Sequence, residues 1–471
     1  MLISNLIQDL QKIVGENNVL SAYEDLIPFI KDWRGIYLGA TAAVVRPANT
    51  QEVAAVIHYC SQRGIAIVPQ GGNTGMCGAA IPNPNGEEIV LSLARMNKIR
   101  SIDALNNTLT VDAGCVLAAI QGTAAEVDRL FPLSLGAEGS CQIGGNLSTN
   151  AGGVNVLRYG NTRDLVLGLE VVLPDGRIWD GLRSLRKDNT GYDLKQLFIG
   201  AEGTLGIITG ATLKLFPRPI ANATAWMAVP SPESALRLLA LIRQHCGERI
   251  SAFEIISRHS LELVWRHIPN TRDPLDTPHE WQVLTELADS GDLASLRADL
   301  ERALESAINE GLVVDAIVAE NRSQAQSLWH MRESIPEGAR QEPVMVYRHD
   351  IAVAVSRIPE FIAEAGAALE ARFPGVRLIC FGHLGDGNLH YNAYIPERLR
   401  NDPKSRNADD VTQTVYDIVR QYGGSFSAEH GIGQSKVNEL VRYKSSVEMD
   451  LMRTIKSALD PKGLFNPGKI L

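Results

Sequence analysis

The most constraining feature of this chain is a glycine-dense segment at residues 136–153, GAEGSCQIGGNLSTNAGG. Side chains this small bury little apolar surface, so the segment can contribute little to a hydrophobic core. Its backbone can instead come very close to a flat or charged ligand. A second segment, QGGNTG at 70–75, comes just after the apolar run 65–68. Its glycines allow backbone N–H groups to turn inward and hold an anion. Together they indicate a ligand with a diphosphate and a flat ring.

A single glycine-rich loop is more often an ordinary turn than a phosphate site. A third run, GAEGTLG at 200–206, shifts the balance toward a cofactor. The Gly-x-Gly-x-x-Gly fingerprint of NAD-binding Rossmann domains does not occur in the sequence, and neither does the P-loop pattern. These absences argue against an NAD-binding Rossmann domain and a P-loop nucleotidase, and leave open which diphosphate-bearing ligand is held.

Two short stretches near the C-terminus carry the chemically active side chains. They are HLGDGNLH at 383–390 and SAEHG at 427–431. Imidazole and carboxylate groups are suitable ligands for zinc and similar divalent metals, and a remaining imidazole can accept a proton. Taken alone, each histidine could equally be a hydrogen-bonded structural residue, and DGN could be a simple turn.

Length and composition limit the remaining choices. A chain of 471 residues exceeds one hydrophobic core and predicts two or three domains. Its net charge of −9 argues against nucleic acid or an anionic membrane as a partner. The six cysteines are scattered without a Cys-x-x-Cys pair, which excludes a cysteine-only zinc site and the usual iron–sulfur spacing. With no evident secretory signal or membrane span, the expected location is the cytoplasm.

Apolar runs separated by turn residues organise the first half as α+β, with a boundary near 216–219. Beyond it, strands alternate with longer helices, which is typical of a sheet covered by helices.

Residues 44–217 closely resemble the FAD domain of the vanillyl-alcohol oxidase/PCMH family, with 131–153 and DNTGYDL at 188–194 as its specific motifs. The stretches 383–390, 427–433 and 465–469 resemble the branch that contains D-2-hydroxyglutarate dehydrogenase, D-lactate dehydrogenase and the FAD subunit of glycolate oxidase. The resemblance covers nearly the whole chain.

The resemblance implies an α+β fold. It predicts a helical lead-in at 1–37 and a PCMH-type FAD-binding domain of two α+β subdomains at 38–217. A substrate or cap domain at 218–410 would have an antiparallel sheet covered by helices. The helical segment 411–471 would return to the FAD domain and complete the active site.

The resemblance also implies the residues that bind FAD. They are expected to be Pro69, Gly71, Gly72, Asn73, Thr74, Gly75, Gly136, Ala137, Ser140, Gly144, Gly145, Ser148, Thr149, Gly152, Gly153, Gly206, Ile207 and Asn466. Family members with covalent flavin often have histidine inside the first loop. This chain has Asn73 there, so noncovalent FAD is expected.

By the same resemblance, His383, His390 and Glu429 would bind a divalent metal, with zinc preferred over manganese, iron or cobalt, and His430 would be the general base. Arg332, Arg348 and Asn392 would bind substrate, since arginine forms paired bonds with carboxylates. Two positions depart from the hydroxyglutarate enzymes: Arg348 where lysine is common, and Pro336 where a threonine is expected. Arg332 could also pair with a neighbour such as Glu333.

The predicted activity is oxidation of a D-2-hydroxy acid, first choice D-2-hydroxyglutarate, by hydride transfer to flavin N5. A separate carrier, such as an electron-transfer flavoprotein or a quinone, would take the electrons. D-lactate or glycolate oxidation, and a role as the FAD subunit of a larger complex, remain alternatives, as does a metal-free alditol or aryl-alcohol oxidase. A homodimer is compatible with the sequence.

Overall fold

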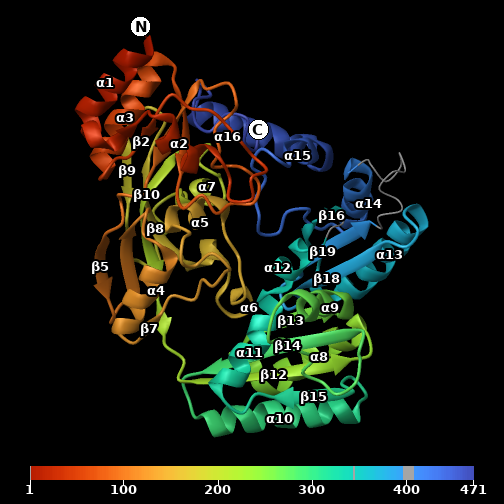
Figure 1. The fold of residues 1–471 in the computed structure, drawn as a ribbon. Helices are drawn as coiled ribbons and strands as arrows, with labels where there is room; N and C mark the ends of the chain where they lie inside the picture. The colour runs from red at the N-terminus through yellow and green to blue at the C-terminus, as the bar shows by residue number, and fades with distance from the viewer. Residues whose placement is uncertain (1, 343–344, 396–407) are drawn as a thin grey trace. The chain divides into compact units, whose positions relative to one another are not determined.

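The computed structural model describes residues 2–342, 345–395 and 408–471, which divide into two compact units (Figure 1). Unit 1 comprises residues 1–153, 160–218 and 429–471, and unit 2 comprises residues 154–159 and 219–428. The division after residue 218 lies one residue from the boundary expected at 217. Residues 411–428 belong to unit 2, whereas the sequence analysis assigned them to the segment that returns to the FAD domain. Each unit is described by itself below.

The N-terminal part of unit 1 is a four-stranded sheet in the order β1-β2-β4-β3. Its strands are β1 (Val19–Leu20), β2 (Val44–Val45), β3 (Ala66–Gln70) and β4 (Glu88–Ser92). Strands β2 and β3 both run parallel to β4, so β2 reaches β3 through the crossover helix α3 (Thr50–Arg63). Asn49 caps this helix by accepting from the Glu52 N–H, and Gly64 ends it in the left-handed conformation. The first glycine loop therefore starts at the carboxyl end of β3.

The second sheet of unit 1 has five antiparallel strands in the order β5-β6-β10-β8-β9. They are β5 (Ile99–Asp103), β6 (Thr108–Asp112), β8 (Val166–Val172), β9 (Ile178–Gly181) and β10 (Ile207–Lys214), and the short pair β7 (Arg129–Leu130) and β11 (Phe216–Pro217) lies outside this sheet. The apolar runs of the sequence become the buried central strands, because a strand covered on both faces needs no polar alternation.

The rest of unit 1 consists mainly of helices that accompany its two sheets. Besides α3 they are α1 (Leu2–Val14), α2 (Tyr23–Ile30), α4 (Leu117–Glu126), α5 (Ile143–Thr149), α7 (Lys195–Phe198), α15 (Val437–Tyr443) and α16 (Ser446–Leu459). Helix α16 begins with a capping box in which Ser445 and Glu448 bond each other's backbone N–H groups. After α16 the chain runs beside β3, where the Asn466 N–H donates to the Ile67 carbonyl at 2.8 Å.

Unit 2 is built on one large antiparallel sheet in the order β15-β12-β14-β13-β18-β19-β16, with β17 also paired to β19. The strands are β12 (Ala221–Val229), β13 (Ile250–Ser257), β14 (Trp281–Asp289), β15 (Asp315–Val318), β16 (Met345–Tyr347), β17 (Asp350–Ala352), β18 (Arg377–His383) and β19 (Asn388–Ile395). The pairing of β13 with β18 joins segments that are more than a hundred residues apart in the chain.

Helices cover both faces of this sheet (Figure 1). They are α6 (Val156–Tyr159), α8 (Pro232–Cys246), α9 (Arg258–His267), α10 (Leu293–Asn309), α11 (Arg322–Glu333), α12 (Ile335–Arg340), α13 (Ile358–Arg372) and α14 (Ala408–Gln421). Helices α9, α11 and α12 share a hydrophobic core with alternate residues of the strands, among them Ile256 and Phe381. The α+β class and the helix-covered antiparallel sheet predicted from the sequence are confirmed. Within the described residues, no helix combines the length and apolarity needed to cross a bilayer.

Candidate active site

One face of the sheet in unit 2 carries a row of two histidines flanked by two carboxylates. Antiparallel register places Glu254 of β13 directly opposite His383 of β18, and Asp350 of β17 directly opposite His390 of β19. Residues directly opposite each other on one face of an antiparallel pair have adjacent side chains. The two imidazole rings lie 5.9 Å apart between centroids. The structure thus brings together the two histidines that the sequence predicted as metal ligands.

Glu254 is fully buried, and its two oxygens serve different partners. Oε1 lies 2.5 Å from Nδ1 of His383, and Oε2 lies 2.7 Å from both Nε and Nη2 of Arg332. Burial by itself raises the pKa of this carboxyl group. The positive charge of Arg332 and the bonded His383 outweigh burial, so the pKa of Glu254 falls to about 2 and the group is ionised at neutral pH. A carboxylate bonded to Nδ1 leaves Nε2 as the nitrogen available to a metal.

Asp350 plays a similar part beside His390, with weaker contact. Its Oδ1 lies 4.0 Å from Nδ1 of His390 and accepts a hydrogen bond from Nδ2 of Asn388 at 2.9 Å. Asp350 is itself buried. Both histidines therefore have a buried carboxylate on the Nδ1 side, as metal-bound histidines commonly do.

Glu429 and His430 belong to unit 1, on the stretch where the chain leaves unit 2. The last residue of unit 2, Ala428, donates its N–H to the Asp350 carbonyl at 3.3 Å. Glu429 accepts a hydrogen bond from the N–H of Gly153 at 2.7 Å, so this carboxylate lies against the end of the glycine-dense segment. A side chain at Gly152 would also collide with it. Two of the predicted site regions, 136–153 and 427–431, therefore meet at Glu429.

The backbone that follows His430 is held by Glu202 from the third glycine-rich run. The Glu202 carboxylate accepts the N–H of Ile432 and the N–H of Gly433, both at 2.7 Å. Burial raises the pKa of Glu202, and the two backbone hydrogen bonds partly oppose that rise. This buried carboxylate anchors the loop that carries the predicted base.

The two principal cofactor segments lie against each other in unit 1. A Cβ at Gly72 would overlap the Ser140 carbonyl, so the first loop fits only because it lacks a side chain there. Asn73 has φ 53°, and its side-chain amide donates to the carbonyls of Pro28 and Lys31. Asn466 donates from Nδ2 to the carbonyls of Ala79 and Glu202. The predicted residues 69–75, 136–153 and 466 thus converge within this unit.

The same segments have the properties expected of a cofactor cradle. Among the described residues, no atom beyond the adjoining backbone lies within 4 Å of where a Cβ would stand at Gly75, Gly136 or Gly145. Three buried oxygens, Gln142 Oε1, Asn146 Oδ1 and Asn466 Oδ1, have no hydrogen-bond partner in this part of the chain. Buried polar atoms normally have partners, so unsatisfied ones beside open glycines fit a polar ligand. The residues present therefore fit FAD.

The remaining predicted cofactor residues are in less open surroundings. Side-chain hydroxyls of Ser148 and Thr149 donate back to the carbonyls of Gly144 and Gly145 inside α5. A Cβ at Gly206 would meet Val171 and Phe198, and Ile207 is buried at the start of β10. Ser148 and Thr149 therefore contribute to hydrogen bonding within the helix, and Gly206 and Ile207 to close packing, in addition to any contact with a ligand.

The predicted substrate residues have different surroundings. Arg332 is buried in the ion pair with Glu254, not with the helix neighbour Glu333, and its guanidinium carbon lies 4.8 Å from the centroid of the Phe381 ring. Arg348 is exposed, and its charge opposes the burial that raises the pKa of Tyr394 to about 12. Asn392 is buried on the same side of β19 as His390, and its Oδ1 accepts the His349 N–H at 3.2 Å.

Sequence reasoning missed Glu254, Asp350 and Glu202. Glu254 offered a faint signal, because it is a single acidic residue in an otherwise apolar strand, AFEII. An acid in a buried strand must have a partner, and the partner is what the tertiary structure reveals.

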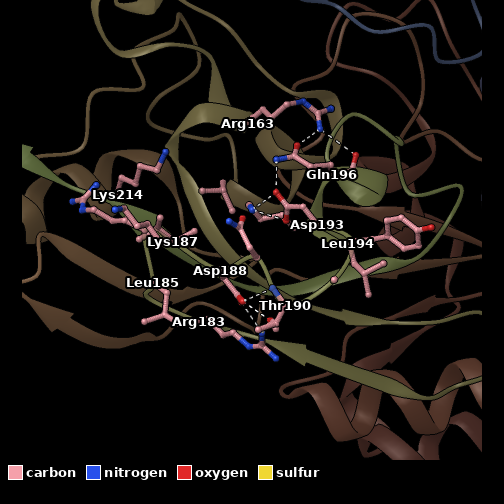
Figure 2. Close-up of a pocket in the computed structure, with 18 of the residues that line it drawn as sticks. Arg163, Arg183, Leu185, Lys187, Asp188, Thr190, Asp193, Leu194, Gln196 and Lys214 are labelled. Atoms are coloured by element: carbon pink, nitrogen blue, oxygen red, sulfur yellow. Dashed lines mark hydrogen bonds and ion pairs between the residues drawn. The ribbon is translucent and has the colours of Figure 1, made fainter.

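Unit 1 also contains a cavity of about 640 Å³ (Figure 2). It is lined by the loop that carries the DNTGYDL motif, where Arg183 pairs with Asp188 and Lys195 with Asp193, each at 2.6 Å. None of the predicted cofactor or metal residues lines it. We therefore base the site on the histidine row and the glycine segments.

Comparison with known proteins shows the family to which the chain belongs. Residues 41–181 match the family model described as "FAD binding domain", and residues 218–470 match "FAD linked oxidases, C-terminal domain". The chain is 39% identical over 462 residues to a mitochondrial D-2-hydroxyglutarate dehydrogenase of Arabidopsis thaliana, covering 98% of this chain and 80% of the relative. It is also 39% identical to a D-2-hydroxyglutarate dehydrogenase of Xanthomonas citri, covering 98% and 96%, and 38% identical to a putative mitochondrial D-lactate dehydrogenase of Schizosaccharomyces pombe, covering 94% and 84%.

Solved structures give the same fold. Substrate-bound p-cresol methylhydroxylase superposes with a TM-score of 0.77 at 18% identity, covering 99% of this chain and 96% of that one. An alkyldihydroxyacetonephosphate synthase gives 0.72 at 17%, covering 98% and 84%. At this identity the likeness shows the fold, which confirms the PCMH-type α+β prediction. The chain belongs to the FAD-linked oxidases, in the FAD-dependent 2-hydroxy-acid dehydrogenase family.

Proposed function

We propose that this protein is a FAD- and divalent-metal-dependent dehydrogenase that oxidises a D-2-hydroxy acid to the 2-oxo acid, with D-2-hydroxyglutarate as the first candidate. The observation that carries the proposal is the pair His383 and His390, each with a buried carboxylate on its Nδ1 side. Relatives named D-2-hydroxyglutarate dehydrogenase, at 39% identity over almost the whole chain, support the substrate.

In this proposal His383, His390 and Glu429 would hold the metal. Nitrogen and oxygen donors of this kind suit zinc, with manganese, iron and cobalt as alternatives. A bound flavin would supply a hydride acceptor for C2, and a bound metal would lower the pKa of the substrate hydroxyl. His430 takes the hydroxyl proton, and Glu202 keeps the loop after it in place.

The substrate's distal carboxylate would be bound by arginine. Arg332 uses two of its five N–H donors on Glu254, so three remain for another acceptor. Arg348 supplies an exposed second cation, and Asn392 lies on the His390 side of β19. The electrons would pass from reduced flavin to a separate carrier, an electron-transfer flavoprotein or a quinone. All six cysteines are buried thiols that form no disulfide within the described residues, which supports the cytoplasm as the proposed location.

D-lactate or glycolate is the second candidate substrate. Two observations favour it. Pro336 stands where the resemblance to the hydroxyglutarate enzymes implies a threonine, and the S. pombe relative carries a D-lactate dehydrogenase name. Dye-linked rates with D-2-hydroxyglutarate, D-lactate and glycolate distinguish the two. Higher kcat/KM for a monocarboxylate would contradict the first choice.

The metal requirement is tested in the same assay. Treatment with EDTA followed by gel filtration is expected to abolish turnover while the flavin spectrum stays unchanged, and added Zn²⁺ or Mn²⁺ should restore it. Full activity in metal-free protein would instead favour a metal-free oxidase mechanism.

A further inference from the structure

Glu254 links two groups to which the proposed function gives separate tasks. It lies on β13 with no exposed surface, between the metal-ligand strand β18 and helix α11. A buried carboxylate is costly unless its oxygens are bonded. Here both are bonded, and to different partners: Oε1 to His383 and Oε2 to Arg332.

The contact with His383 selects a tautomer. A carboxylate only accepts hydrogen bonds, so Nδ1 of His383 must be the protonated nitrogen at 2.5 Å from Oε1. In the neutral ring, Nε2 is then the lone-pair nitrogen. Because the strand pairing sets Glu254 opposite His383, the ring is also fixed in orientation.

The contact with Arg332 fixes a cation in the same way. Nε and Nη2 both bind Oε2 at 2.7 Å, and the guanidinium carbon lies 4.8 Å from the Phe381 ring centroid. Phe381 in turn contacts His390, with centroids 4.9 Å apart. The guanidinium is therefore held by one carboxylate and one ring, both of which also contact a histidine of the pair.

We propose that Glu254 is a positioning residue that couples metal affinity to recognition of the substrate's distal carboxylate, by holding His383 and Arg332 through its two oxygens. This inference rests on the proposed function for the tasks of His383 and Arg332. It assigns a role to a further residue, Glu254. Losing this carboxylate is expected to change both the metal affinity, through His383, and the KM for the diacid substrate, through Arg332.

The test compares Glu254→Gln with Glu286→Gln in the full-length, FAD-loaded protein. Glu286 is a matched control, because it is a largely buried glutamate on β14 of the same sheet. It bonds Trp329 and Thr224 and, among the residues that the structure describes, no cation. Zinc affinity is measured by competition with a chromophoric chelator. For Glu254→Gln we expect it to fall about 10- to 100-fold, which is the usual cost of losing such a partner, and for Glu286→Gln to stay unchanged.

The second readout is substrate selectivity. For Glu254→Gln, KM should rise more for D-2-hydroxyglutarate than for D-lactate, while Glu286→Gln keeps the ratio of the wild type. A third readout needs no metal: ¹⁵N-histidine NMR should show the Nδ1-protonated tautomer of His383 in the wild type and its loss in Glu254→Gln. Lower thermal stability with unchanged zinc affinity and an unchanged KM ratio would overturn the inference.

Coupling is tested directly by Arg332→Gln, alone and combined with Glu254→Gln. Non-additive losses in zinc affinity are expected, since the Arg332 and Glu254 side chains bond each other directly. Additive losses would contradict coupling.

If Glu254→Gln does not fold, the test uses Glu254→Asp, which keeps the charge on a side chain one methylene shorter. Its zinc affinity and KM ratio are expected to move in the same directions. A wild-type protein that binds no metal or oxidises no 2-hydroxy acid would refute the proposed function itself, and intact wild-type activity with an unaffected Glu254 variant refutes only this inference.

Discussion

Replacing Gly145 with alanine should raise the stability of the FAD-free protein while weakening its affinity for FAD. Gly145 is the third residue of α5 and has a helical backbone. Within the described residues, nothing beyond the helix itself lies within 4 Å of where its Cβ would stand. A methyl group therefore fits the protein without cofactor, and it enters the space where the cofactor is expected.

Two opposing effects set the magnitude. Glycine inside a helix costs roughly 0.5–1 kcal/mol relative to alanine, so the free energy of unfolding should increase by up to about 1 kcal/mol. A methyl group forced into an occupied space typically costs about 1–3 kcal/mol. At about 1.4 kcal/mol per tenfold, the dissociation constant of FAD should rise roughly 5- to 150-fold.

The assay is urea unfolding of the apoprotein together with FAD titration followed by flavin fluorescence. Gly122→Ala in α4 is the matched control, because Gly122 is an exposed helical glycine that also has open space around it. It should gain similar stability with no change in FAD affinity. Gly72→Ala, which would overlap the Ser140 carbonyl, should lose both. Unchanged FAD affinity in Gly145→Ala would refute the placement of the cofactor beside α5.

Three further predictions concern single side chains. His430→Ala should keep flavin and metal but lose about 10²- to 10⁴-fold in kcat, the usual contribution of a general base; a near-normal rate would remove that role. Arg348→Ala should raise KM for diacids more than for D-lactate, and equal increases would argue against contact with the distal carboxylate. Burial raises the pKa of Cys60 to about 12 and also raises the pKa of Cys380. In the folded protein these thiols stay protonated at pH 8, and their pKa values return to the ordinary range on unfolding. Ellman's reagent should therefore label them only in denaturant. Rapid labelling of the native protein would contradict their burial.

Much of the cofactor half could be predicted from local sequence. Glycine is needed where two backbones touch, as at Gly72 against Ser140, and this requirement is visible directly in the local composition of the chain. The same holds for His383 and His390, whose spacing across a tight turn returns both to one face of a β-hairpin.

The partners of these residues were decided by tertiary structure alone. Glu254 and His383 are 129 positions apart and meet because β13 pairs with β18 in one particular register. A shift of one residue would turn Glu254 to the opposite face of the sheet, and no local pattern specifies that register. Local sequence is sufficient to identify which chemical groups are present and where the backbone must lack a side chain. The pairing of distant strands determined that each histidine has a buried carboxylate behind it, because side chains become neighbours across a sheet only once the strands are aligned.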